Sequence, residues 1–140
     1  MRIRALDHAD VPRLVALLAT LGYGVDHPEL ERRLGALGAD DRLLVADDGG
    51  TPAGFVVARL DNHLAEGPAV EITSLVVDPA ARRRGIGAAL VGAVEAWARD
   101  RGRDRVRLRS NVVRDDAHAF YEAEGFAVVK RSTVFEKRID

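Results

Sequence analysis

The stretch Glu71-Ile72-Thr73-Ser74-Leu75-Val76-Val77-Asp78-Pro79, continued by Ala80-Ala81-Arg82-Arg83-Arg84-Gly85-Ile86-Gly87-Ala88-Ala89-Leu90, decides the fold. Its first half predicts a β-strand, because it is a short apolar run rich in β-branched residues that stops at Asp78-Pro79. Its second half predicts a glycine-bearing loop that opens a helix. Free backbone N–H groups and the positive end of the helix dipole then point at one spot, which predicts a site for phosphate or pyrophosphate.

The rest of the chain predicts an α/β protein with a mixed sheet. Apolar helical periodicity predicts helices over residues 7–21, 27–38, 85–101 and 115–125. Short apolar runs predict strands over 3–5, 42–46, 54–60, 105–109, 126–129 and 133–136, with a hairpin turn at 47–50 and a loop at 61–68.

Composition narrows the class of protein. With 140 residues, 47% hydrophobic and 31% charged, the chain predicts one folded domain over 1–140 and excludes a disordered chain. It has no cysteine, which excludes disulfides, thiolate metal sites and cysteine nucleophiles. Its four histidines show no metal-ligand spacing, so we expect no metal. No signal peptide or membrane span is evident, and a cytoplasmic protein is the expectation.

An arginine stripe is the one feature that suggests nucleic acid. Arg103, Arg105, Arg107 and Arg109 alternate and so share one face of a predicted strand. Against nucleic-acid binding stand a net charge of −1, only seven aromatic residues (one Trp, two Tyr, four Phe) and no aromatic interleaving. We therefore expect solvated or ion-paired arginines, and neither nucleic acid nor membrane as a partner.

Glu71 is the first candidate for chemistry. A carboxylate in an otherwise apolar strand is costly to bury without a partner, and partial burial raises a carboxyl pKa toward the range useful for proton abstraction. The alternative is a strand-end glutamate that faces solvent beside Pro68.

The motif arginines and glycines resemble those of a known family. Arg82-x-x-Gly85-x-Gly87 matches the (Gln/Arg)-x-x-Gly-x-(Gly/Ala) signature of the GNAT superfamily of N-acetyltransferases, and Glu71 stands eleven residues before Arg82. The later block Asn111…Ala117-x-x-Phe120-Tyr121-x-x-x-Gly125-Phe126 resembles that family's Asn…Ala-x-x-Phe-Tyr-x-x-x-Gly-Phe motif.

The resemblance implies a single-domain α+β fold. It has a mostly antiparallel sheet of six to seven strands, splayed at the central strand, and about four helices. It also implies acetyl-coenzyme A as co-substrate. The implied coenzyme-binding residues are Leu75, Val76, Val77, Arg82, Arg83, Arg84, Gly85, Ile86, Gly87, Ala88, Asn111 and Tyr121. Within this set, the arginines that contact phosphate stay open, and Asn111 either binds pantetheine or caps the next helix.

The resemblance also implies catalytic roles. Glu71 would be the general base, directly or through water, and Tyr121 the general acid that protonates the departing coenzyme A thiolate. For Tyr121 the alternative is an aromatic residue that packs under the sheet. The acceptor would be an amine, most simply a small molecule, and the first two helices would line its side of the sheet. Three alternatives stay open: an acetyl-coenzyme A sensor without efficient turnover, an acetyltransferase acting on protein N-termini or lysines, and a homodimer formed through the last strands.

Overall fold

The computed structural model describes residues 1–110 and 115–140, which form two compact units, Met1–Arg109 and Ser110–Asp140. The first unit contains a five-stranded sheet in the order β1-β2-β3-β4-β5. Its strands are β1 (Arg2–Ala5), β2 (Asp41–Asp48), β3 (Thr51–His63), β4 (Gly67–Val77) and β5 (Val106–Leu108). The first four strands are antiparallel and β5 is parallel to β4. The mixed, mostly antiparallel α+β fold is therefore confirmed, with five strands in the described residues rather than six to seven. Its assignment to one domain stays a prediction.

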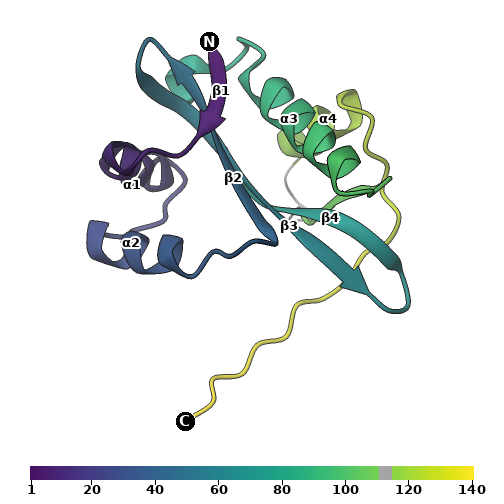
Figure 1. Ribbon diagram of the computed structural model, residues 1–140. Coiled ribbons are helices and arrows are strands. Elements are labelled where there is room, and N and C mark those ends of the chain that lie inside the picture. The colour runs from purple at the N-terminus through teal and green to yellow at the C-terminus, as the bar shows by residue number, and fades with distance from the viewer. Residues whose placement is uncertain (111–114) are drawn as a thin grey trace. The chain divides into compact units, whose positions relative to one another are not determined.

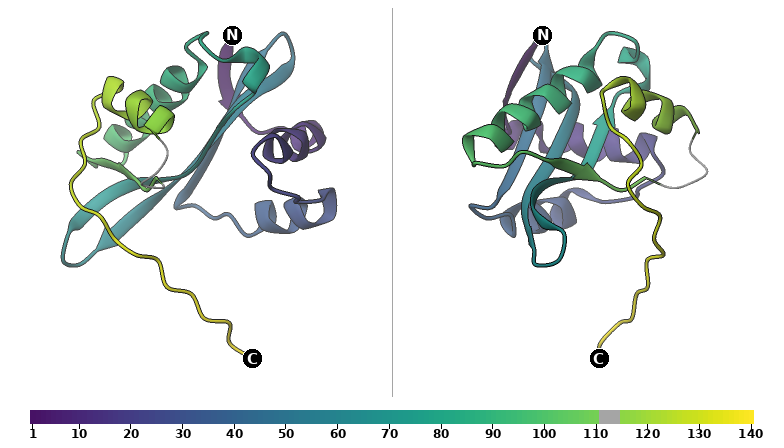
Figure 2. Two further views of the ribbon diagram at one scale, coloured as in Figure 1. Left: turned by 180° about the vertical axis from the view of Figure 1, so that it is seen from behind. Right: turned by 90° about the vertical axis from the view of Figure 1, so that its right-hand side faces the viewer.

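Helices cover both faces of this sheet (Figures 1 and 2). The 3₁₀ turn η1 (His8–Asp10) leads into α1 (Val11–Thr20), which packs with α2 (His27–Gly35) on one face. On the other face lies α3 (Ile86–Asp100), which follows the 3₁₀ turn η2 (Pro79–Ala81). Among the described residues, none of the helices is long and apolar enough to cross a membrane.

Gly54 sets how closely α3 approaches the sheet. A Cβ atom at this position would lie 2.7 Å from the Val76 carbonyl oxygen and 3.3 Å from the Ile86 side chain. Only glycine leaves room for the start of α3 to rest on β3 and β4. The fully buried side chains of Leu90, Val91 and Val94 then fix α3 on that face.

The connection between β3 and β4 corrects one prediction. Residues 61–68 were expected to form a loop, but β3 continues to His63 and β4 begins at Gly67. The two strands pair out to His63 and Gly67, and arginine side chains donate to carbonyl oxygens of this extension, among them those of Asp61 and Glu66. These long-range contacts offset the weak strand propensity of the Asp61-Asn62 segment.

The second unit corrects another prediction. It contains α4 (Asp115–Ala123), as expected, but residues 126–140 form neither helix nor strand. The strands predicted over 126–129 and 133–136 are wrong for this chain as described, because β-structure needs a partner strand and none pairs with this segment in the described residues. The apolar side chains of Val128, Val129, Val134 and Phe135 are accordingly exposed.

Asp10 carries the main buried charge of the first unit and supports a prediction about stability. It accepts hydrogen bonds from Arg4 at 2.7 and 3.0 Å and from the Asp7 N–H at 2.8 Å. The Arg4 guanidinium lowers the pKa of the Asp10 carboxyl in the folded protein. The stability that this provides is therefore present above the unfolded pKa of about 3.9 and is lost as the pH falls through the lower folded value.

An Asp10→Asn variant is expected to lose about 2–3 kcal/mol of unfolding free energy at pH 7, because Arg4 then loses a charged partner. The deficit should shrink below about pH 4, where Asp10 of the parent becomes protonated. Urea unfolding at pH 7 and at pH 3 measures both. Asp104→Asn is the control, since the Asp104 side chain is 93% exposed. Equal stability of the Asp10 and Asp104 variants at pH 7 would contradict this role.

Candidate active site

The sheet opens beside the second half of β4. Strand β5 pairs with β4 only at Val70, Ile72 and the residue between them, and it ends at Leu108. Strand β3 stays paired with β4 as far as Val77. From Thr73 to Val77, the edge of β4 that faces away from β3 therefore has no partner strand in the first unit. This is the predicted splay.

A β-bulge decides which backbone groups face this open edge. Val57 pairs with Ser74 but Ala58 pairs with Ile72, so Thr73 is an extra residue in β4. Before the bulge, the Val70 N–H donates to the Arg105 carbonyl, on the β5 side. After the bulge, the Asp78 N–H donates to the Ala53 carbonyl, on the β3 side.

Alternation of N–H groups along the strand then places those of Leu75 and Val77. Because the Asp78 N–H points toward β3, the N–H groups one and three residues earlier point the other way, toward the open edge. The Val76 side chain is 3% exposed and belongs to the core under α1. Of the three residues predicted on this strand, two thus offer free backbone donors, and Val76 serves packing.

The loop after β4 ends at the N-terminus of α3. Gly85 is the N-cap residue with φ +76°, a left-handed conformation that glycine adopts without strain. Arg83 also has a positive φ, +67°, which is uncommon for a residue with a side chain. No side chain caps α3, so the N–H groups of Ile86, Gly87 and Ala88 have no acceptor within the helix. A Cβ atom at Gly85 would meet no atom of the described residues within 4 Å, so the space in front of these donors is open.

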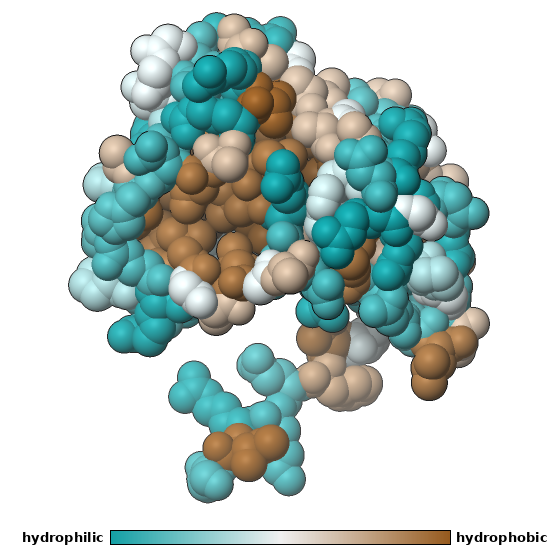
Figure 3. All heavy atoms as spheres, in the orientation of Figure 1, coloured by the Kyte–Doolittle hydropathy of each residue, from teal (hydrophilic) through white to brown (hydrophobic). Residues whose placement is uncertain are grey.

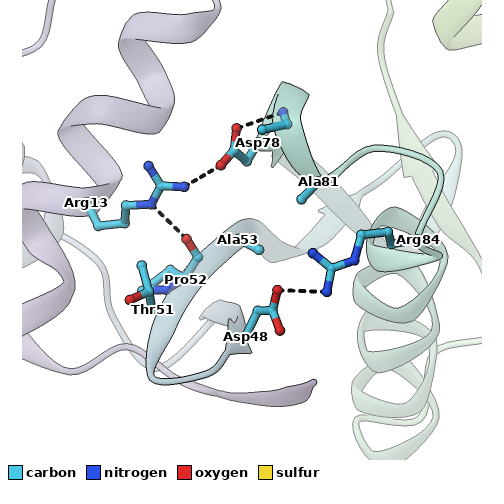
Figure 4. Close-up of a pocket in the computed structure, with 9 residues that line it drawn as sticks. Arg13, Asp48, Thr51, Pro52, Ala53, Asp78, Ala81 and Arg84 are labelled. Atoms are coloured by element: carbon cyan, nitrogen blue, oxygen red, sulfur yellow. Dashed lines mark hydrogen bonds and ion pairs between the residues drawn. The ribbon is translucent and has the colours of Figure 1, made fainter.

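The three motif arginines differ in their contacts. Arg84 forms an ion pair with Asp48 of the β2–β3 hairpin at 2.8 Å (Figure 4). Arg82 and Arg83 are exposed and form no ion pair with any residue that the structure describes. The structure therefore separates the three residues, which the sequence could not do.

A second ion pair lies across the same small cavity, about 210 Å³ in volume. Arg13 of α1 contacts Asp78 at 2.5 Å and donates to the Pro52 carbonyl at 2.9 Å (Figure 4). The Asp78 carboxylate also accepts the Ala80 N–H, and this bond together with Arg13 lowers the pKa of Asp78. The beginning of the loop is thus tied to α1 and β3 by a charged group that stays ionised at neutral pH.

Glu71 has the partner that its partial burial requires. Its side chain is 16% exposed, and one carboxylate oxygen lies 2.5 Å from the Arg109 guanidinium. The cross-strand register Asp41–Arg59–Glu71 places it on the sheet face that α1 and α2 cover, because directly paired residues share a face. A charged carboxylate therefore stands on that face, beside the point where β4 and β5 separate.

The arginine stripe is engaged with protein groups, as expected. Arg103 donates to the carbonyls of Asp61 and Ala69, and Arg105 to those of Glu66 and Pro68. Arg107 contacts the carboxylates of Asp61 and Glu66, each at 3.3 Å. The stripe holds the long β3–β4 extension.

The last two predicted site residues lie beyond the first unit. Asn111 lies outside the described residues. Tyr121 belongs to α4, where its ring packs edge-to-face against Phe120 and Phe126 with centroids 5.5 and 5.9 Å apart. The packing role considered for Tyr121 is therefore real within its own unit, and its catalytic role stays a prediction.

Comparison with known proteins identifies the family. A model described as the Acetyltransferase (GNAT) family matches residues 12–126. The chain belongs to the GNAT acetyltransferase family. This GNAT chain is 31% identical to an aminoglycoside N(6')-acetyltransferase type 1 of Stenotrophomonas maltophilia, over 99% of the chain and 94% of that protein.

Two further similarities concern an archaeal protein and a solved structure. The chain is 35% identical to an uncharacterized N-acetyltransferase of Methanocaldococcus jannaschii over 71% of its own residues, and it spans only 46% of that relative. It superposes with a TM-score of 0.85 on the aminoglycoside N-acetyltransferase AAC(6')-Iy, solved with the bisubstrate analogue CoA-S-monomethyl-acetylneamine. That pair is 22% identical over 99% and 98% of the two chains, which shows a shared fold.

Several features of this GNAT chain escape inspection of its sequence. The extra residue Thr73, the Glu71–Arg109 pair and the Arg84–Asp48 pair each depend on the register between strands or on contacts between distant elements. Only Arg109 had a signal, since its alternation with Arg107 placed both on the face of Glu71. Among the described residues, no group of three or more acidic or histidine side chains is arranged to hold a metal ion.

Proposed function

We propose that this GNAT protein transfers the acetyl group of acetyl-coenzyme A to a primary amine on a small molecule, by direct attack of the amine on the thioester. The observation that carries the proposal is the open edge of β4, which leads straight into the uncapped N-terminus of α3. One stretch of chain thus presents backbone donors for an extended arm and then for an anion.

The residues present suit the chemistry of acetyl-coenzyme A, which supplies the activated thioester. The N–H groups of Leu75 and Val77 would bind the amide-containing pantetheine arm as an added strand is bound. The N–H groups of Ile86, Gly87 and Ala88 would bind the pyrophosphate, with the helix dipole and the nearby arginines adding positive charge.

Glu71 supplies the base that the reaction requires. A primary amine with a pKa near 10 is free at pH 7 in only about one molecule in a thousand, and the ammonium form has no lone pair for attack. Leu75 lies four residues beyond Glu71, roughly 12 Å along the strand, so the proton would reach Glu71 through water rather than directly. Tyr121 would return a proton to the departing thiolate, a nearly balanced transfer because a free thiol has a pKa of about 8.5 and a phenol about 10.

The first test combines two measurements on the purified protein. Calorimetric titration with acetyl-coenzyme A should show one binding site. Release of free thiol should then require an added amine and yield one acetylated amine per thiol. Binding without release on any amine in a broad panel would favour the sensor alternative. A failure to bind acetyl-coenzyme A would overturn the proposal.

The arginines of the loop can be ranked by the same titration. Arg82→Ala and Arg83→Ala combined are expected to weaken acetyl-coenzyme A binding about tenfold, and the deficit should narrow at high salt because the lost attraction is electrostatic. Arg84→Ala should change affinity less than threefold, since Arg84 is held by Asp48. A larger loss for Arg84→Ala than for the double variant would contradict this assignment.

A further inference from the structure

The sheet face that carries Glu71 continues into an apolar floor. The row Leu43–Val57–Ser74 is the next row after Asp41–Arg59–Glu71 on that face, and the row Val45–Phe55–Val76 follows it. Leu43 and Val57 are only partly buried, whereas Val45 and Phe55 belong to the core. Moving away from Glu71 along the strands, the face therefore changes from charged to apolar within one row.

Two helices and their connection add apolar walls to this floor. Leu18 and Leu21 from the end of α1, Val25 from the connection and Leu34 from α2 pack against the same core and stay partly exposed. Figure 3 shows the result as a hollow of apolar side chains between α1, α2 and the strands, with polar side chains around it. The hollow is formed within the first unit.

The carboxylates around this hollow are already neutralised. Glu29 is paired with Arg32 and Arg33. Glu31 accepts from both His27 and His8, which lowers its pKa. Asp26 accepts the Glu29 N–H, Asp41 the Gly38 N–H, and Glu71 is paired with Arg109.

The charge of the row beside the hollow is likewise not acidic. Asp41 and Glu71 share this face with Arg59, Arg107 and Arg109, and Arg59 is exposed without an ion pair in the described residues. Binding of an acceptor with several ammonium groups needs several unpaired carboxylates, because each desolvated charge must regain a partner. The structure provides only Glu71 near the place of reaction.

Building on the proposed function, we infer that the acceptor is an amine with a single positive charge on an apolar body, such as an alkyl or arylalkyl amine. Its ammonium group would lie toward Glu71 and its apolar body on Leu43 and Val57, between α1 and α2. This excludes aminoglycosides, whose many ammonium groups would meet an apolar floor and Arg59.

Binding measurements test the inference without requiring turnover. The protein is saturated with coenzyme A and titrated with ethylamine, 2-phenylethylamine and kanamycin. Burial of the phenyl ring should make 2-phenylethylamine bind at least 30-fold more tightly than ethylamine. It should also bind more tightly than kanamycin, with little change between 0.05 and 0.5 M salt. Equal binding of the two monoamines, tighter binding of kanamycin, or no binding of 2-phenylethylamine would overturn the inference.

Two variants locate the apolar body. Val57→Ser on the floor and Leu21→Ser on the wall should each weaken 2-phenylethylamine about tenfold and leave ethylamine unchanged. Leu21 lies at the end of α1, so its variant remains informative where the floor variant fails to fold. Leu64→Ser is the control, because Leu64 is fully exposed on the β3–β4 turn. Unchanged 2-phenylethylamine binding in a folded Leu21→Ser protein would place the amine elsewhere.

Thiol release with the same amines separates this inference from the proposed function. Acetylation of 2-phenylethylamine supports both. Binding of 2-phenylethylamine without acetylation would refute the transfer function and leave the apolar site standing. Acetylation of kanamycin in preference to 2-phenylethylamine would support transfer and refute the apolar acceptor.

Discussion

A Gly87→Val variant is expected to bind acetyl-coenzyme A at least 100-fold more weakly than the parent while remaining folded. Gly87 is the second residue of α3, in the turn whose N–H groups have no acceptor within the helix. A branched side chain here would occupy the space in which a pyrophosphate approaches those donors. The lost contacts are charge-assisted hydrogen bonds, which are about twice as strong as neutral ones. Calorimetric titration measures the affinity.

The matched control lies in the same helix. Gly92 of α3 has nothing within 4 Å of an added Cβ atom, so Gly92→Ala should bind acetyl-coenzyme A normally and gain up to about 1 kcal/mol in stability. Circular dichroism establishes that both variants fold. Parental affinity in a folded Gly87→Val protein would show that the anion binds elsewhere.

A Glu71→Gln variant is expected to keep its affinity for acetyl-coenzyme A and to lose about 100-fold in kcat at pH 7. A positioned general base contributes roughly 10² to 10⁴ in rate, and glutamine cannot accept the proton. Arg109 would lose its carboxylate partner at the same time. Stopped-time thiol release at saturating acetyl-coenzyme A and amine measures kcat.

The pH profile distinguishes a lost base from a disturbed fold. As the pH rises toward the amine pKa of about 10, more of the acceptor is already deprotonated and needs no base. The deficit of Glu71→Gln should therefore shrink steadily with rising pH. A constant deficit at every pH would instead indicate a structural effect. Glu95→Gln is the control, since Glu95 lies on α3 with only a 3.8 Å contact to Arg99. Parental kcat in Glu71→Gln would assign the proton to another group or to solvent.

The N-terminal four-fifths of the fold could be predicted with good boundaries because the relevant signals are local. Asp26 and Pro28 mark the start of α2, and the glycine pair 49–50 marks the β2–β3 hairpin. The apolar stripe Ile86, Leu90 and Val94 predicts α3, and all three side chains are buried. Such signals depend on neighbours within one helical turn or one hairpin.

The errors arose where strands depend on distant partners. The segment 61–68 has poor strand propensity, yet it is drawn into β3 and β4 by the ladder between them and by the arginines that bind its carbonyls. The segments 126–129 and 133–136 have good strand propensity, yet they stay outside the sheet. Strand propensity describes how a side chain fits a pleated surface, so it says little until the neighbouring strand is known.

The candidate site divides in the same way. Local pattern alone identifies the strand of Leu75 and Val77, the Arg82–Gly87 motif and the helix that follows, because side-chain type and spacing specify each. Only the tertiary structure decides that Thr73 is an extra residue that turns two N–H groups to the open edge. It alone pairs Glu71 with Arg109 and sets Leu43 and Val57 beside Glu71. These features follow from the register between strands, and a shift of one residue would move every side chain to the opposite face.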